Sequence, residues 1–473
     1  MRKFIFIVLS VLLVLSFTAL ALAEEPQIKL GGRILVRGWL INNIEGFGGT
    51  DGIPVDASST AFYTTNAYLT VDAKIMDNLQ AYMELETSGG HNPQSGLYIW
   101  GNHDSKPAAD LFFRQLWIQY TGSGLMGCSS GIKVGHQLLT LGEKQFYNME
   151  RFGTDAIVVF TEPTKELFLG ALTAKQNEGD IKRSGDDVDA YAVLGTYKID
   201  KDNTLGLFVA DVHTSDYPEA AEGLITFTPE FGSIASLVDG VDLWNVGLHA
   251  NGKIMNMLTY AAELDVQFGD LEERGTGEEE NFAGWAIMAK LGYEIPAAPL
   301  TVRASFVYGS GDDDPEDEDI GEFQFVGPFD SEGAVARFPH YTQIYERSIF
   351  TAATEQVFSG STPFNPSRNT GTANTTYFNL GLDYMPMKDL TLSLDGFYLQ
   401  ATETGGWEDL VGHSVDDSLG WEADFKGSWK ITKNLTYFVE AGFFDADDFY
   451  KDVFGVDDPK GVTVLIHGLN ITF

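Results

Sequence analysis

The most constraining feature of this sequence is an alternation of bulky apolar and polar residues that recurs along the chain. It is cleanest between Leu258 and Phe268, where Leu, Tyr, Ala, Leu, Val and Phe alternate with Thr, Ala, Glu, Asp and Gln. The stretch from Trp421 to Lys430 repeats the pattern, with Trp, Ala, Phe, Gly and Trp at every second position. A period of two places the two residue classes on opposite faces of a β-strand. Charge on one face and bulky apolar groups on the other fit a strand between lipid and water.

The sequence closes with a strand, Gly461 to Phe473, that stops on an aromatic ring. This ending resembles the closing strand of bacterial outer-membrane barrels, where a terminal Phe acts as an assembly signal, so we assign that role to Phe473. An open sheet edge is not tolerated in lipid, so this strand is expected to pair with the first one. The alternative is an edge strand of a secreted β-sandwich, whose strands would show the same alternation. Long strands, charge on nearly every polar face and alternating long and short connections favour the barrel.

The N-terminus predicts export. Met1-Arg2-Lys3 precedes an apolar run and then Ala21-Leu22-Ala23, which is typical of a secretory signal peptide spanning residues 1–23. Residues 24–473 are then one domain, long for a globular unit but ordinary for a large barrel. Only one cysteine, Cys128, is present, so no internal disulfide can form. Export without a disulfide framework indicates the envelope of a Gram-negative bacterium.

The pattern along the chain predicts an all-β, antiparallel transmembrane barrel of about eighteen strands, with eight short turns and nine long loops. An even number of strands places both termini in the periplasm, with the short turns there and the long loops outside. Sixteen strands is the alternative, because the segments Asp155–Lys175 and Thr214–Gly240 show the weakest strand pattern. Asn251-Gly252 is a strong hairpin signal and is predicted to form a turn.

The formal net charge of −38 argues against nucleic acid as a partner and suits a surface that attracts cations. On the predicted water-facing side of the strands, carboxylates outnumber basic groups, which indicates a channel with weak cation preference. The predicted pore-lining residues are Arg33, Arg37, Asp72, Glu84, Glu86, Lys133, Glu263, Asp265, Lys290, Arg303, Asp383, Asp395, Glu422, Asp424, Lys426 and Glu440. Arg33 and Arg37, on one face of the first strand, could instead form a local ladder for anions.

The longest connection, residues 310–374, begins with an acidic run and is a candidate to fold into the lumen. Carboxylate oxygens suit hard cations, so this run is a possible weak Ca²⁺ or Mg²⁺ site, although it lacks the spacing of an EF-hand. A solvated acidic loop is the alternative. The candidate ligands are Asp312, Asp313, Asp314, Glu316 and Asp317. No other cofactor is expected, and because no nucleophile, phosphate-binding or metalloprotease motif appears, we do not expect an enzyme.

Two stretches resemble the alginate-export family of outer-membrane barrels. They are Phe306–Asp319, FVYGSGDDDPEDED, and Lys133–Phe160, KVGHQLLTLGEKQFYNMERFGTDAIVVF. The resemblance implies an eighteen-stranded monomeric pore, but it does not fix the solute, because relatives include general porins. Alginate export is associated with a markedly cationic lumen, whereas acidic residues outnumber basic residues on the inner wall expected here.

Three functions therefore remain open. The first is a porin-like channel in the outer membrane for passive diffusion of small hydrophilic solutes or ions. The second is an exporter of an anionic, alginate-like polysaccharide, and the third is a surface-binding or adhesin-like barrel with a plugged lumen. Expected partners are outer-membrane lipid and lipopolysaccharide, the barrel-assembly machinery, and the solute or polysaccharide itself.

Overall fold

A computed structural model describes thirteen ranges of the chain. They are residues 26–42, 59–87, 98–100, 111–124, 127–150, 152–183, 185–216, 238–273, 277–314, 317–327, 342–345, 372–455 and 461–473. The expected signal peptide at residues 1–23, most of Thr214–Gly240 and the candidate ligand Glu316 lie outside these ranges.

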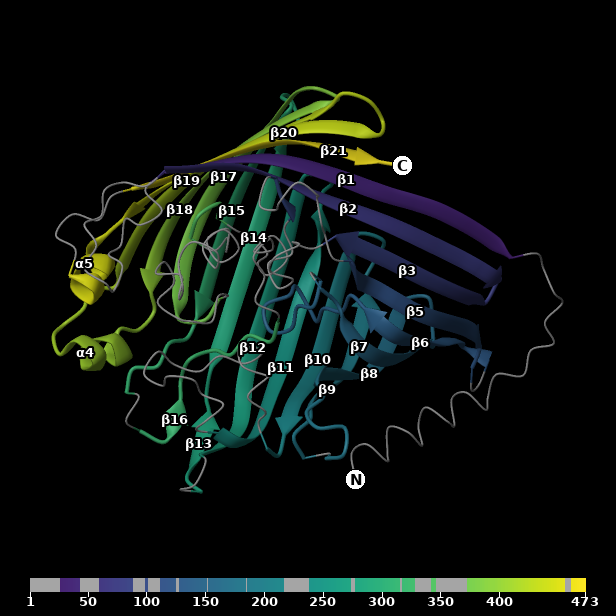
Figure 1. Ribbon diagram of the computed structural model, residues 1–473, viewed down its shortest axis with the longest axis horizontal. Helices are drawn as coiled ribbons and strands as arrows, with labels where there is room; N and C mark the ends of the chain where they lie inside the picture. The colour runs from purple at the N-terminus through teal and green to yellow at the C-terminus, as the bar shows by residue number, and fades with distance from the viewer. Residues whose placement is uncertain are drawn as a thin grey trace.

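Eighteen antiparallel strands form one closed barrel, as expected, and the sixteen-strand alternative is wrong (Figure 1). Each strand pairs with its two neighbours in sequence order, and β1 pairs with β21. The barrel strands are β1 Gln27–Asn42, β2 Ser59–Met76, β3 Leu79–Thr87, β5 Leu111–Ser123, β6 Ser129–Gln137, β7 Thr154–Glu162, β8 Leu167–Asn177, β9 Val188–Lys198, β10 Asn203–Thr214, β11 Val238–Ile254, β12 Leu258–Glu273, β14 Trp285–Ile295, β15 Leu300–Gly309, β17 Thr375–Met387, β18 Leu390–Ala401, β19 Ser418–Lys430, β20 Leu435–Ala446 and β21 Val462–Thr472.

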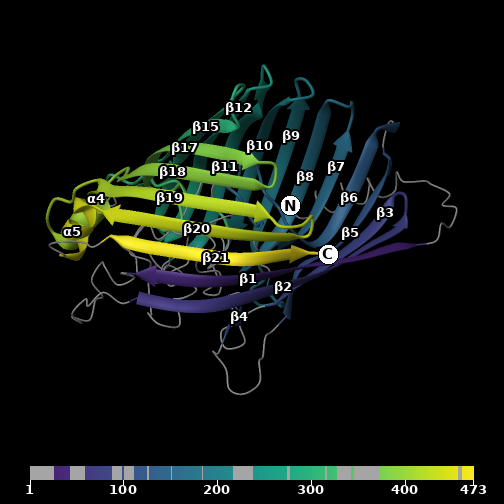
Figure 2. The ribbon, with the colours of Figure 1, turned by 90° about the horizontal axis from the view of Figure 1, so that it is seen from above.

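Short elements lie in the long connections of the barrel. They are β4 Tyr98–Ile99, β13 Glu279–Phe282, β16 Asp319–Ile320, α4 Gly405–Val411 and α5 Asp448–Phe454. The two helices lie at one end of the barrel, and the C-terminus lies at the other (Figure 2). Eight connections of at most five residues join strand pairs at this second end, so the alternation of short turns and long loops matches the expectation.

The closing contact is made at the C-terminus. The backbone N–H of Phe473 donates to the carbonyl of Gly32 at 3.1 Å, and the N–H of Gly32 donates back to the carbonyl of Phe473 at 2.9 Å. The phenyl ring fits because Gly32 has no side chain: a Cβ there would lie 2.6 Å from the ring. The last residue therefore completes the ladder between β21 and β1.

The expected turn at Asn251-Gly252 is wrong. Both residues lie inside β11 and pair with β10 on one side and β12 on the other. The turn instead lies at Met255 and Asn256, which have φ angles of 53° and 57°, and the N–H of Met257 donates to the carbonyl of Ile254. Two consecutive positive φ angles suit the twist of a tight hairpin turn. The turn therefore forms at the end of a longer strand, although its residues are not the favoured ones.

The two faces of the sheet have opposite character, which β12 shows most clearly. Leu264 and Val266 are 39% and 47% exposed, whereas the intervening Asp265 is 0% exposed. In the same way Trp421 is 45% exposed and its neighbour Glu422 is 0% exposed. The apolar residues therefore face outward and the charged residues face the lumen. Among the described residues, no helix is long and apolar enough to cross a membrane.

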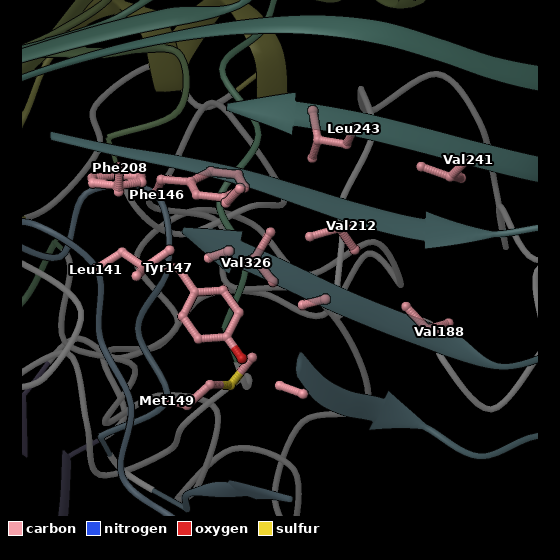
Figure 3. Close-up of a cluster of buried hydrophobic side chains, with 14 of the residues drawn as sticks. Leu141, Phe146, Tyr147, Met149, Val188, Phe208, Val212, Val241, Leu243 and Val326 are labelled. Atoms are coloured by element: carbon pink, nitrogen blue, oxygen red, sulfur yellow. The ribbon is translucent and has the colours of Figure 1, made fainter. Parts of the chain in front are cut away.

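The inward side chains are not polar on every strand, which differs from the expectation of a polar inner wall. From β7 to β12 the inward side chains include Leu172, Val188, Phe208 and Leu243, all at most 4% exposed. They pack against residues 141–149 of the connection after β6 and against Phe323 and Val326 (Figure 3). This apolar core covers one side of the lumen, and a second buried apolar cluster lies at the long-loop end of β1 and β14 to β21.

Candidate functional site: the lumen of the barrel

All sixteen candidate pore-lining residues lie on the strand face opposite to the exposed apolar side chains. The structure divides them into carboxylates that bind chain segments folded into the lumen, carboxylates that pair with basic side chains, and basic groups around a hollow in the wall. Lys290 projects inward from β14, on the same face as the buried Ala286 and Met288.

The first carboxylate pair, Glu263 and Asp265 on β12, binds the connection after β6. The backbone N–H of Glu143 donates to Glu263, and the amide of Gln145 donates to Asp265 at 3.2 Å. The turn that brings this connection so close requires Gly142, whose φ is 53° and whose absent Cβ would lie 2.5 Å from a Glu263 oxygen. These wall carboxylates therefore act as acceptors for an infolded segment.

A second segment, Ile320 to Gly327, lies beside the first. The N–H of Asn148 donates to the carbonyl of Val326 at 3.0 Å, and the N–H of Val326 donates to the carbonyl of Phe146 at 2.8 Å. On its other side, Gln267 of β12 exchanges two hydrogen bonds of 2.7 Å with the backbone of Gln324. The two segments are thus hydrogen-bonded to each other and to the wall.

A third segment, residues 342–345, binds the second carboxylate pair, Glu422 and Asp424 on β19. Glu422 accepts the N–H of Ile344 at 2.7 Å and that of Tyr345 at 2.9 Å, and Asp424 accepts the N–H of Gln343 at 2.9 Å. Segments two and three both belong to the connection 310–374, so parts of this connection contact the inner wall.

Asp383 and Asp395 form ion pairs with a basic side chain of strand β15. Arg303 of β15 contacts Asp383 at 2.8 and 3.1 Å and Asp395 at 2.9 Å, so one guanidinium bridges β17 and β18. Two carboxylates facing one guanidinium leave a single net negative charge on this part of the wall.

The sequence did not identify two other bridging cations. Arg114 of β5 contacts Glu84 at 3.0 Å and Glu86 at 3.8 Å, and Lys175 of β8 lies within 3.1 Å of three carboxylates. Arg114 could not be assigned from alternation, because the ladder between β3 and β5 shifts register between Glu84 and Leu85. A bulge adds one residue to a strand, so that beyond it the inward and outward positions in the sequence are exchanged.

A basic hollow lies on the polar side of the lumen, between β1 and β18 to β21. Arg33, Arg37 and Lys426 line it together with Glu440 and polar groups of the same strands. The Arg33 Nε donates to the Asn470 Oδ1 at 2.9 Å, and the Arg37 Nη2 donates to the Asn66 Oδ1 at 2.8 Å. The two arginines are therefore held in fixed positions, four residues apart on β1.

An aromatic stack lies on the same inner wall, nearer the short-turn end. Tyr82 and Trp117 stack with ring centroids 5.2 Å apart, and the Lys133 Nζ lies 4.1 Å from the centroid of the indole. Beside it is a second hollow whose lining includes Asp72 and Gln80. Stacked rings with a cation and hydrogen-bonding groups form a surface on which a ring-shaped solute can lie.

The acidic run after β15 is only partly described. Burial is the main cause that raises the pKa of Asp312 to about 6, although the N–H of Asp314 donates to this carboxylate at 3.3 Å. Within the part of the chain that the structure describes, no three His, Cys, Asp or Glu side chains come together in a way that could hold a metal ion. With Glu316 outside that part, the weak Ca²⁺ or Mg²⁺ site stays a prediction.

These features define a class of protein: a closed β-barrel with an apolar outer wall and a polar, partly filled lumen, which is the architecture of outer-membrane channels. Residues 57–460 match the family model described as alginate export, and the chain belongs to this family. No curated protein matches the sequence.

Several solved structures share the fold. Pseudomonas aeruginosa OpdL superposes with a TM-score of 0.54 at 11% identity, covering 94% of this chain and 98% of OpdL. P. aeruginosa OccK11 (OpdR) gives 0.54 at 10% identity, with 97% and 99% covered. Acinetobacter baumannii OccAB2 gives 0.52 at 11% identity, with 94% and 98% covered. At these identities the likeness shows the fold alone. The barrel and its family place the chain in the outer membrane of a Gram-negative bacterium.

Proposed function

We propose that this protein is a channel for the passive diffusion of small hydrophilic solutes or ions across the outer membrane. The observation that carries the proposal is the polarity of the two faces of the closed barrel. Apolar side chains are exposed on the outer face, and charged, hydrogen-bonded side chains lie on the inner face. The proposed passage runs along the polar part of the inner wall, beside the apolar clusters of β7 to β12 and of the long-loop end of β1 and β14 to β21. Such a channel needs no bound cofactor and carries out no reaction.

The channel prefers cations weakly. Carboxylates outnumber basic groups on the inner wall, but Arg303, Arg114 and Lys175 each contact at least two of them and offset part of their charge. The carboxylates that bind infolded segments accept hydrogen bonds from N–H groups of those segments, which offset negative charge at these positions. The field in the lumen is thus negative but small, and a small field gives a small preference.

The test is the reversal potential of the purified protein in a planar bilayer under a salt gradient. We expect ohmic current and a reversal potential on the cation-selective side. Current that is strongly anion-selective would favour export of an anion, and an absence of current would favour a plugged, surface-binding barrel.

Export of an anionic polysaccharide is the second candidate. It is favoured by the basic hollow at Arg33, Arg37 and Lys426 and by the aromatic stack with Lys133. A uronate polymer would present carboxylates to the first group and the apolar faces of its sugar rings to the second. Current block by an oligomer of alginate but not by a neutral glucose oligomer of equal length would support this candidate. Equal weak block by both would support the general channel.

Assembly and surroundings are part of the proposal. The outward apolar wall contacts outer-membrane lipid, and we expect lipopolysaccharide to surround the long-loop end. The terminal ring of Phe473, 64% exposed beside β1, remains available for recognition by the barrel-assembly machinery.

A further inference from the structure

We propose that Glu422 and Asp424 form a latch that holds residues 342–345 in the lumen and thereby sets the conductance of the channel. The proposal rests on the proposed channel function and adds a device that controls it. The two carboxylates are positioning residues, which act through the segment they bind.

The geometry of the contact is specific. Three successive backbone N–H groups, at Gln343, Ile344 and Tyr345, converge on two side chains with donor–acceptor distances between 2.7 and 2.9 Å. Consecutive N–H groups that point to one side form a natural site for an anion. Here the barrel wall supplies the acceptor oxygens. Both carboxylates are at most 1% exposed, so water cannot replace them without movement of the segment.

The neighbouring strand is shaped to receive the segment. A Cβ at Gly442 of β20 would lie 2.8 Å from the Cβ of Gln343 and 3.2 Å from the Cδ1 of Ile344. Contacts this short are not tolerated, so a side chain at Gly442 and the segment cannot occupy the same space. The same Cβ would also lie 2.8 Å from the Oδ1 of Asp424, so a side chain at Gly442 would displace both the segment and one of its acceptors.

Two further contacts of the segment lie inside the barrel. The Tyr345 hydroxyl lies 3.1 Å from the Thr375 Oγ1, and its ring centroid lies 6.1 Å from that of Phe444. Ile344 and Tyr345 belong to the buried cluster that fills the long-loop end of β1 and β14 to β21. The segment therefore occupies cross-section that a solute would otherwise use. Loss of the latch is expected to return this space to the channel.

Two variants test the latch in different ways. Glu422→Gln keeps the size of the side chain but replaces one acceptor oxygen by a donor, so that one backbone N–H of the segment faces another donor. Gly442→Val removes no carboxylate and displaces the segment, together with the Asp424 carboxylate, by steric contact. For both we expect a larger single-channel conductance and more frequent transitions between current levels, because ohmic current grows with the open cross-section.

The matched controls are Glu84→Gln and Gly427→Val. Glu84 is a lumenal carboxylate bound to Arg114 and Gln115 of the adjacent strand, so its neutralisation alters the charge without releasing the segment. A Cβ at Gly427 would make only ordinary contacts of 3.5 Å or more. For Glu84→Gln we expect a shift in reversal potential at unchanged conductance, and for Gly427→Val no change. The heat-dependent electrophoretic mobility of each variant shows that the barrel has folded.

The outcomes separate the latch from the channel function. If Glu422→Gln and Glu84→Gln change reversal potential and conductance alike, the carboxylate acts only through its charge and the latch is refuted. Unchanged conductance in Gly442→Val would refute it as well. Current that is absent from the wild type but present in both latch variants supports the latch and overturns the proposal of an open channel. Absence of current in all of them overturns both proposals.

Discussion

Replacement of Arg303 by Met is expected to destabilise the barrel by about 3 kcal/mol. Arg303 contacts Asp383 and Asp395 with four N···O distances between 2.8 and 3.1 Å, and its stem packs along the wall. Met keeps the stem but leaves two facing carboxylates without their shared cation. Breaking a buried pair by removing one partner costs about 3–5 kcal/mol. The side chain of Asp395 is 6% exposed but that of Asp383 is 26% exposed and can regain water, so the lower end of the range applies.

The measurement is reversible urea unfolding of the barrel in phospholipid vesicles, followed by tryptophan fluorescence. Adding Asp395→Asn to Arg303→Met should recover part of the loss, with a coupling energy of about 1–3 kcal/mol in the double-mutant cycle. If Arg303→Met lowers the free energy of unfolding by less than about 1 kcal/mol, the ion pairs of Arg303 contribute no more than a solvent-exposed ion pair does. The assignment of Arg303 as the shared cation of two partly buried carboxylates would then be refuted.

Three further outcomes are expected. Deletion of Phe473 should lower the amount of folded barrel in the outer membrane of an expressing cell, and an unchanged amount would contradict its role as an assembly signal. Met255→Gly should stabilise the barrel by about 1 kcal/mol in urea unfolding, because a non-glycine residue in the left-handed conformation is strained; destabilisation would show that the Met side chain stabilises the turn. Asp312 has its pKa raised to about 6, so its ionised form is disfavoured in the folded protein and stability should increase as pH falls through that value. Asp312→Asn should therefore stabilise the barrel at about pH 7.5 and lose this advantage near pH 4, as measured by the midpoint of thermal unfolding; a gain that is the same at both values would refute the assignment.

The strands and their facing could be predicted because lipid and water impose opposite requirements on the two faces. Glu263, Asp265 and Glu422 were placed correctly by alternation alone, because each side chain of a barrel strand faces either the lipid or the lumen. The turn after β11 was missed for a related reason. Asn251-Gly252 is the stronger local signal, but the pairing of β11 with both neighbours extends beyond it, and tertiary pairing outweighs turn propensity.

The interior could be predicted only in part. Alternation identifies which residues face inward, but not what they contact, and the acceptor role of Asp424 depends on Gln343, which lies 81 residues away in the sequence. Arg114 was missed because a bulge interrupts the period of two. The apolar inward side chains of β7 to β10 also carry no local signal, since a strand that is apolar on both faces looks like any buried strand.

The central claim, that lipid contacts the outer wall while solute passes inside the ring, can be tested at two adjacent residues. In a Cys128→Ser background, Arg33→Cys places a thiol on the inner wall and Ile34→Cys places one on the outer wall, where Ile34 is 39% exposed. A charged, membrane-impermeant thiol reagent is added while single-channel current is recorded. We expect a stepwise change in current for Arg33→Cys and none for Ile34→Cys. A step for Ile34→Cys with none for Arg33→Cys, or equal steps for both, would contradict the account.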